Sequence, residues 1–75
     1  MKLSDLKVGQ RCVVTNVGGE GPLRRRLLDM GLTPKTLVLL RNTAPMGDPM
    51  ELTLRGYSLS LRRGDAHLVE VEAAP

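Results

Sequence analysis

Two alternating runs near the middle of the chain constrain its fold more than any other feature. Apolar residues occupy every second position in Met50–Leu54 and again in Tyr57–Leu61, and only Arg55 and Gly56 separate the two runs. A two-residue turn at that point fixes which residues face each other and gathers the apolar side chains of both runs on one face. The predicted pairs are Leu54 with Tyr57, Thr53 with Ser58, Leu52 with Leu59, Glu51 with Ser60 and Met50 with Leu61. A slip of one residue would turn the apolar side chains toward water, so the sequence predicts a β-hairpin in this register.

The stretch from residue 21 to residue 34 is the one segment that is typical of an α-helix. Pro22 suits the first helical position, and Gly31 suits the left-handed residue that follows the last turn. The proline at the end of the stretch prevents the helix from continuing. In such a Schellman ending the side chains of Leu27 and Leu32 meet, and this apolar contact sets the direction in which the chain leaves the helix.

The remaining apolar segments are predicted to be strands. They cover residues 11–17, 36–41 and 68–72, and a short turn at 3–6 tucks two leucines against the core. Consecutive apolar residues in 36–41 predict a central strand with the helix over its outer face. The strand at 11–17 is likewise expected to be covered on both faces.

Five short antiparallel strands are too few to form a stable flat sheet, whereas a curled sheet with a helix against it can enclose a core. The sequence therefore predicts a mainly β fold that forms a single domain over residues 1–75. The expected architecture is a small, partly open SH3-like barrel of about five antiparallel strands, with one α-helix between the first two strands.

Length and motif content argue against an enzyme. A chain of 75 residues buries only about 60% of the surface that it exposes when unfolded, which leaves little room for a closed active site. The glycine-rich segment 18–21 lacks the Lys-Ser or Lys-Thr of a phosphate-binding loop, and the single histidine, His67, has no nucleophile near it in the sequence. We therefore expect no enzymatic activity and no bound cofactor.

The sequence also lacks the pattern of a metal site. Cys12 and His67 are the only residues of their types, and neither forms a ligand pair with another residue at a typical spacing. A lone cysteine suits a reducing compartment and is expected to be a small buried residue of a strand. No apolar run approaches the roughly 18 residues of a membrane span, and the amino terminus lacks a signal-peptide core. These features predict a cytoplasmic protein without a metal site.

The distribution of arginine is the sequence feature that helix stability does not explain. Arg24, Arg25 and Arg26 lie in the first turns of the predicted helix, where the helix dipole favours anions, and Asp29 lies in the last turn, where it favours cations. Either the cluster is merely solvated, with Arg25 and Arg26 paired to Asp29, or it binds a partner. The net charge of +3 is compatible with an acidic protein surface or a nucleic acid as a partner. Single-stranded nucleic acids bind by stacking on several aromatic side chains, however, and Tyr57 is the only aromatic residue.

Four segments together resemble the ferrous iron transport protein A (FeoA) family. They are Leu23–Pro34, Ala44–Met50, Arg55–Arg62 and Leu68–Val71, and their order and spacing agree with the family over nearly the whole chain. The resemblance implies a small cytoplasmic SH3-like protein, not an enzyme, that is accessory to bacterial ferrous iron uptake. It also implies action on the membrane permease FeoB and its GTP-binding domain. A similar barrel occurs in metal-dependent repressors, so the fold alone does not decide the role.

The leading hypothesis is a protein-interaction module that binds and modulates FeoB through the helix and the loops beside it. The residues predicted to make this contact are Arg24, Arg25, Leu28, Met46 and Asp48. The alternative is a basic barrel that binds nucleic acid or serves as a metal-regulator domain, although no nucleic acid is expected. A third hypothesis is direct carriage of ferrous iron, but the sequence contains no recognisable site for the metal. An unpaired strand edge would also allow a weak homo-oligomer.

Overall fold

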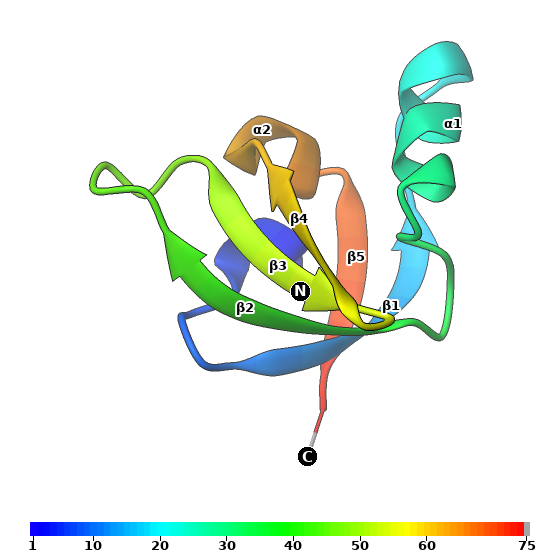
Figure 1. Cartoon of the computed structure of the whole chain (residues 1–75). Helices are drawn as coiled ribbons and strands as arrows, with labels where there is room; N and C mark the ends of the chain where they lie inside the picture. Colours follow the sequence, from blue (N-terminus) through cyan, green and yellow to red (C-terminus); the bar gives the residue numbers. More distant parts are fainter. Residues whose placement is uncertain (75) are drawn as a thin grey trace.

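A computed structural model describes residues 1–74 of the chain (Figure 1). In chain order its elements are the short 3-10 helix η1 (Leu3–Asp5), β1 (Arg11–Val17), α1 (Gly21–Asp29), β2 (Leu37–Thr43), β3 (Met50–Leu54), β4 (Tyr57–Leu61), α2 (Arg63–Ala66) and β5 (Val69–Ala73). The described chain is therefore mainly β, with an α-helix between its first two strands, as the sequence predicts.

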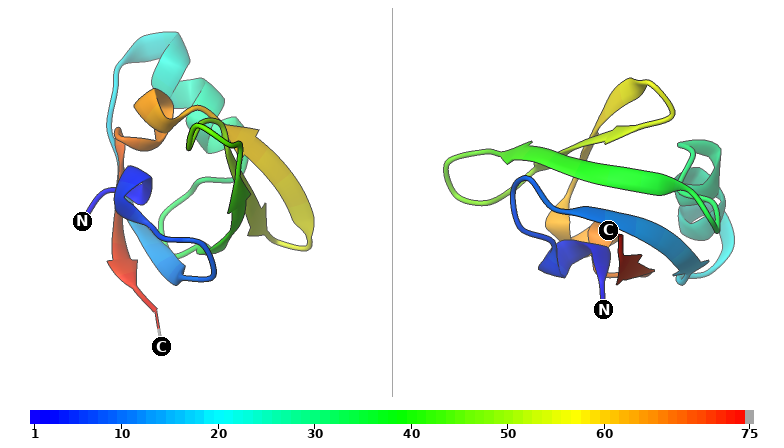
Figure 2. Two further views of the ribbon diagram at one scale, coloured as in Figure 1. Left: turned by 90° about the vertical axis from the view of Figure 1, so that its left-hand side faces the viewer. Right: turned by 90° about the horizontal axis from the view of Figure 1, so that it is seen from below.

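The five strands of this part of the chain form one antiparallel sheet in the order β4–β3–β2–β1–β5, so β2 is central as predicted. The sheet curls around a core of aliphatic side chains (Figure 2). Within residues 1–74 no strand pairing joins β4 to β5, so the barrel is partly open. One edge of β4 consequently has no neighbouring strand in the described chain.

The hairpin of β3 and β4 has the predicted register at every pair. Arg55 and Gly56 both adopt positive φ, at 49° and 83°, which is the backbone of a type I′ turn. Tyr57 departs from the pattern, because its side chain is 42% exposed and turns away from the core. Its hydroxyl donates a hydrogen bond to the carbonyl of Met30. The tip of the hairpin thereby holds the C-terminal end of α1.

The C-terminal end of α1 is the predicted Schellman ending. The amide of Leu32 donates to the carbonyl of Leu27 over 3.2 Å, and the amide of Gly31 donates to the carbonyl of Leu28 over 3.0 Å. Gly31 has the required positive φ, 100°. Leu27 and Leu32 are completely buried, so the apolar contact at this ending is also part of the barrel core.

The expectation that α1 covers the outer face of the sheet is wrong. Three residues, 18–20, connect β1 to α1, so the helix begins where the strand ends and stands at one end of the barrel (Figure 1). Leu37 on the outer face of β2 is 49% exposed as a result. On β1, Cys12 and Val14 are buried but Thr15 is exposed, so this strand is also fully covered on one face only.

The bounds of β2 and β5 differ from the predicted strands by one or two residues, since β2 covers Leu37–Thr43 instead of 36–41 and β5 covers Val69–Ala73 instead of 68–72. β2 continues to Thr43, because a bulge at Arg41 keeps the strand paired with β3 beyond the point where the sequence pattern breaks. α2 begins at Arg63, where Oδ1 of Asp48 accepts a hydrogen bond from the Arg63 amide over 2.9 Å. In residues 1–74 no helix is long and apolar enough to cross a membrane.

Candidate partner-binding surface

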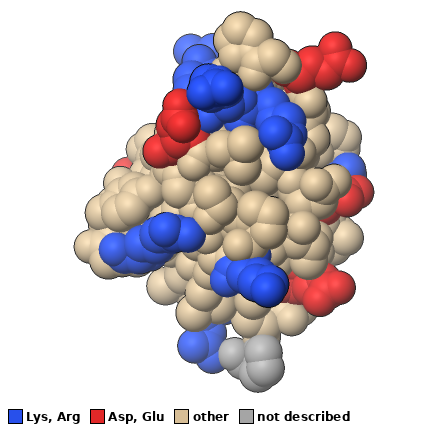
Figure 3. All heavy atoms as spheres, turned by 90° about the vertical axis from the view of Figure 1, so that its right-hand side faces the viewer, with Lys and Arg blue, Asp and Glu red and all other residues tan. Residues whose placement is uncertain are grey.

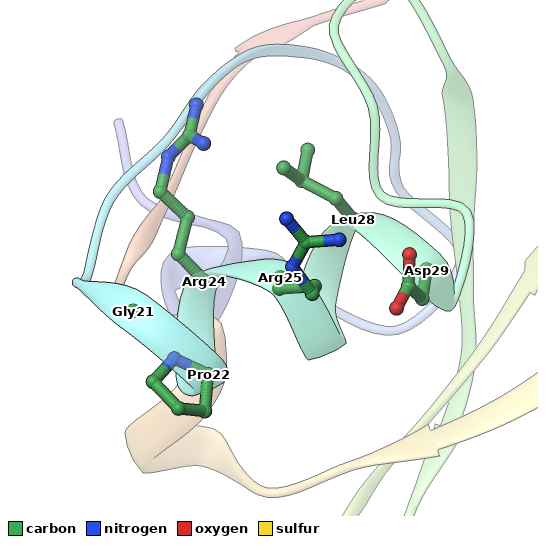
Figure 4. A pocket seen from close by; sticks show the side chains of 6 residues that line it. All are labelled: Gly21, Pro22, Arg24, Arg25, Leu28 and Asp29. Carbon is green, nitrogen blue, oxygen red and sulfur yellow. The ribbon is translucent and has the colours of Figure 1, made fainter.

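Three of the predicted contact residues lie together on the outer side of α1. Arg24, Arg25 and Leu28 line a shallow hollow in the surface (Figure 4). The hollow is completed by Gly21, Pro22 and Asp29. Leu28 is partly buried against the core, whereas both arginines are exposed. Basic side chains gather over α1 on this face of the molecule (Figure 3). The outer side of α1 thus combines positive charge with an apolar floor.

The three arginines of α1 have different surroundings. Nε of Arg24 donates a hydrogen bond to the carbonyl of Val17 over 3.1 Å, which holds this side chain against the end of β1. Arg26 pairs with Asp65 of α2, with 3.3 Å between Nη2 and Oδ2. Arg25 forms no hydrogen bond or ion pair with its side chain inside the described chain. Among the three arginines of α1, Arg25 is therefore the one whose side chain has no polar contact inside the described chain.

Arg25 and Arg26 do not form the ion pairs with Asp29 that their spacing on the helix allows. Asp29 makes no ion pair with any residue of the range 1–74. Arg26 instead reaches Asp65, which lies 39 positions later in the sequence. The tertiary fold supplies a partner on α2 that competes with the neighbour on the same helix.

Met46 and Asp48, the other two predicted contact residues, lie far from α1. Their loop, residues 44–49, projects from the opposite end of the molecule (Figures 1 and 2). Met46 is 93% exposed there, and Asp48 caps the start of α2 through the Arg63 amide. The predicted contact residues therefore form two separate groups.

Arg63 holds the 44–49 loop in place, a role that the sequence analysis did not assign. Its Nε donates to the carbonyl of Gly47 over 2.9 Å, and its Nη1 donates to the carbonyl of Ser4. One guanidinium thus ties the loop to η1 and α2. The neighbouring Arg62 is exposed, and no local sequence pattern distinguishes the arginine that turns inward from the one that turns outward.

A second hollow, which the sequence analysis missed, lies between α1 and β4. We call it the α1–β4 groove, and its lining residues are Arg26, Met30, Ser60, Leu61, Arg62 and Asp65. Two contacts join the C-terminal half of α1 to the other side of the groove, the hydrogen bond from Tyr57 to Met30 and the ion pair of Arg26 with Asp65. The only sequence signal for this groove was the free strand edge expected of a partly open barrel.

The residues that could bind a metal are scattered. Within residues 1–74, no three side chains of His, Cys, Asp or Glu come together as a metal-binding group. Cys12 is buried, and burial raises the pKa of its thiol to about 11. His67 is exposed, with its Nδ1 3.5 Å from Oγ of Ser4.

The sequence matches the FeoA domain family over residues 1–73. A fusion protein of Fe(2+) transport protein A with the Fe(2+) transporter FeoB, from Porphyromonas gingivalis, is 39% identical over 72 residues. These residues are 96% of this chain and 8% of the fusion protein, so the chain spans a small part of that relative.

Solved structures agree with the family match. The FeoA protein of Chlorobium tepidum has a TM-score of 0.91 at 41% identity, over 100% of this chain and 71% of the other. The FeoA of Stenotrophomonas maltophilia in complex with zinc, described as a prokaryotic SH3 domain protein, has a TM-score of 0.84 at 26% identity, over 96% and 89% of the two chains. The SH3-like fold is thereby confirmed. This chain therefore belongs to the FeoA domain family.

Proposed function

We propose that this protein is a cytoplasmic accessory protein of ferrous iron uptake that binds the permease FeoB and modulates its transport. In the Porphyromonas gingivalis relative, a domain similar to nearly all of this chain is joined covalently to FeoB. Such a link raises the effective concentration of two domains for each other and so favours pairs that interact. A protein that is not linked to its partner needs a specific surface to bind it.

The composition of the outer side of α1 is the observation that carries this proposal. Arg24 and Arg25 border the partly exposed Leu28 around one shallow hollow. Arginine is enriched in protein interfaces, because its planar guanidinium is weakly hydrated and binds carboxylates through two parallel hydrogen bonds. The complementary surface on FeoB would present carboxylates around an apolar side chain.

The stability of the fold does not explain why these arginines are here. Acidic residues stabilise the first turn of a helix, and the first turn of α1 contains none. Arg25 also gains no ion pair inside the described chain. A negatively charged surface of a partner protein would explain the positions of these arginines, which the stability of the fold does not explain.

We extend the proposal to the 44–49 loop as a second contact region. Met46 is almost completely exposed, and methionine adapts its unbranched side chain to the surface of a partner. Arg63 fixes the loop, so little conformational freedom would be lost when Met46 and Asp48 meet FeoB. Because this loop and α1 lie at opposite ends of the molecule, the two regions can be tested independently.

The substitution Arg25→Glu tests the α1 surface. The affinity for the purified cytoplasmic part of FeoB, measured by calorimetry, should fall about tenfold or more because an attraction becomes a repulsion. The melting temperature should stay close to that of the wild type, since Arg25 lies in the middle of α1, where the helix dipole has little effect, and forms no ion pair inside the described chain. Lys7→Glu, at an exposed lysine before β1, makes the same change of charge as a control. Equal affinity of both variants would remove Arg25 from the interface.

The nucleic-acid alternative depends on the same basic residues. Tyr57 is exposed, but its hydroxyl is bonded to Met30, so its ring is held beside α1. Titration with duplex and single-stranded DNA at several salt concentrations tests this alternative, because binding to phosphates must weaken steeply with salt. Failure to bind at low salt would exclude it.

A further inference from the structure

The free edge of β4 is a surface that the proposed α1 contact does not use. We propose that it binds an extended acidic segment of a partner protein, which adds to the sheet as an additional strand beside α1. The inference rests on the proposed function, because it assigns this segment to the cytoplasmic part of FeoB.

The register of the hairpin determines which backbone groups of β4 are free. A type I′ turn closes on a pair that exchanges both backbone hydrogen bonds, here Leu54 and Tyr57. Hydrogen-bonded and non-hydrogen-bonded pairs alternate, so Ser58 and Ser60 turn their amides and carbonyls away from β3. No hydrogen bond from another part of residues 1–74 reaches these groups. Two donors and two acceptors therefore stand at the spacing that a further strand requires.

The α1–β4 groove gives this edge the form of a binding site. Residues of α1 and β4 both line the groove, and Met30 and Leu61 add apolar surface to its lining. The bond from Tyr57 to Met30 lies near one end of β4, and the ion pair of Arg26 with Asp65 lies near the other. Of the five residues of β4, Ser60 and Leu61 line the groove, and the free edge continues from them toward Tyr57. An extended segment of about four residues, roughly 13 Å long, would pair along this edge.

The charges of the groove favour an acidic segment. Arg62 is exposed and forms no ion pair inside the described chain. Asp65 is the only acidic residue among the lining residues of the groove, and it is already paired with Arg26. The Arg26 side chain is 63% exposed, and an exposed ion pair contributes little stability. Arg26 can therefore exchange Asp65 for a carboxylate of the ligand at small cost.

A second copy of this chain is a poorer occupant of the same edge. Antiparallel pairing of two β4 strands would bring together Arg26 and Arg62 of both copies, with no free carboxylate in the groove to compensate. Each copy would also carry its own α1 beside the edge that the other copy must reach. The groove thus disfavours self-pairing and selects an acidic segment from another protein.

Ser60→Pro tests strand addition directly. Proline removes the outward amide of Ser60 and is tolerated at a strand edge whose amide does not bond to the neighbouring strand. Ser60→Ala is the matched control, because it removes the hydroxyl and keeps the amide. Affinity for the purified cytoplasmic part of FeoB should fall about tenfold in Ser60→Pro relative to Ser60→Ala. In the wild-type protein, hydrogen exchange at the Ser58 and Ser60 amides should slow when FeoB binds.

Each outcome bears on one of the two proposals. If FeoB binds but the Ser58 and Ser60 amides exchange as fast as in the free protein, strand addition is overturned and the proposed function stands. If Ser60→Pro does not fold, Arg62→Glu is compared with Lys7→Glu, and equal affinities of these two variants overturn the assignment of the acidic segment to this groove. If wild-type protein does not bind FeoB at all, both proposals fall.

Discussion

Gly31 lies where the end of α1 contacts the hairpin. Gly31→Ala tests whether this position requires both a positive φ and the absence of a side chain beside Tyr57. The residue has φ of 100°, which a side chain with a Cβ atom rarely adopts. A Cβ atom at this position would overlap the Tyr57 hydroxyl oxygen and would lie 3.3 Å from Cδ1 of Leu54. The tyrosine must therefore move away from the carbonyl of Met30, its hydrogen-bond acceptor.

The expected cost of Gly31→Ala is the sum of two effects. The positive φ costs about 1–2 kcal/mol for a residue with a Cβ atom. Displacement of the Tyr57 hydroxyl from Met30 costs about 1 kcal/mol more, the value of a typical hydrogen bond. The free energy of unfolding should fall by about 2–3 kcal/mol, which lowers the melting temperature of a domain of this size by roughly 10–20 °C. Urea denaturation followed by circular dichroism measures the free energy of unfolding, and thermal denaturation followed by the same signal measures the melting temperature.

Gly9→Ala is the matched control for Gly31→Ala. Gly9 has φ of 90°, and no atom outside its own neighbours lies within 4 Å of the position of its Cβ atom. This control should show the conformational cost alone. In a Tyr57→Phe background, Gly31→Ala should approach the cost of Gly9→Ala, because the overlapping oxygen is gone. Equal costs of the two alanine variants in the wild-type background would refute the steric part of this reasoning.

Three further measurements test separate features. Folded protein should resist alkylation of Cys12 at neutral pH, because burial raises the pKa of the thiol to about 11; rapid labelling seen by mass spectrometry would contradict this. Arg63→Ala should speed hydrogen exchange in the 44–49 loop, and unchanged exchange would show that Arg63 does not hold the loop. A hydrogen bond from Lys2 lowers the pKa of Glu70. The pair therefore stabilises the fold at pH values above the pKa that this carboxyl has in the unfolded chain. The stabilisation is lost as the pH falls through the lower pKa of the folded state. Glu70→Gln should therefore slightly flatten the dependence of the melting temperature on acid pH.

Local patterns predicted the hairpin and the end of the helix because each has a single solution. Only one register of β3 and β4 keeps the apolar side chains on one face, and the turn at Arg55 and Gly56 imposes the same register. The ending of α1 was equally determined, since a glycine in the left-handed region places Leu27 against Leu32. Where two independent local requirements agree, the sequence is sufficient.

The two arginine contacts that local spacing failed to predict, those of Arg26 and Arg63, are long-range. Arg26 had a neighbour on its own helix, Asp29, and it pairs with Asp65 because the fold brings α2 near α1. Arg63 reaches Ser4 at the other end of the chain. The spacing of residues along an element does not reveal which other element will lie beside it, so such pairs require the three-dimensional fold.

The separation of Met46 and Asp48 from α1, by contrast, could have been predicted. The helix precedes β2 and the 44–49 loop follows it, so the two lie at opposite ends of this strand. The seven residues of β2 span roughly 23 Å at 3.3 Å per residue. Both elements are evident in the sequence, and the strand predicted between them already keeps the helix and the loop from forming one surface.

The charges along α1 run opposite to what the helix dipole favours, but the structure makes this a narrower argument for a binding partner than the sequence alone did. The fold itself gives Arg24 an acceptor in the carbonyl of Val17 and gives Arg26 a counter-ion in Asp65. Charge reversal at either arginine would break a contact within the protein, so a loss of binding could come from a displaced helix as well as from a lost partner contact. Arg25 has no such internal role in the described chain. It is therefore the helix arginine at which substitution separates binding to FeoB from folding of the barrel.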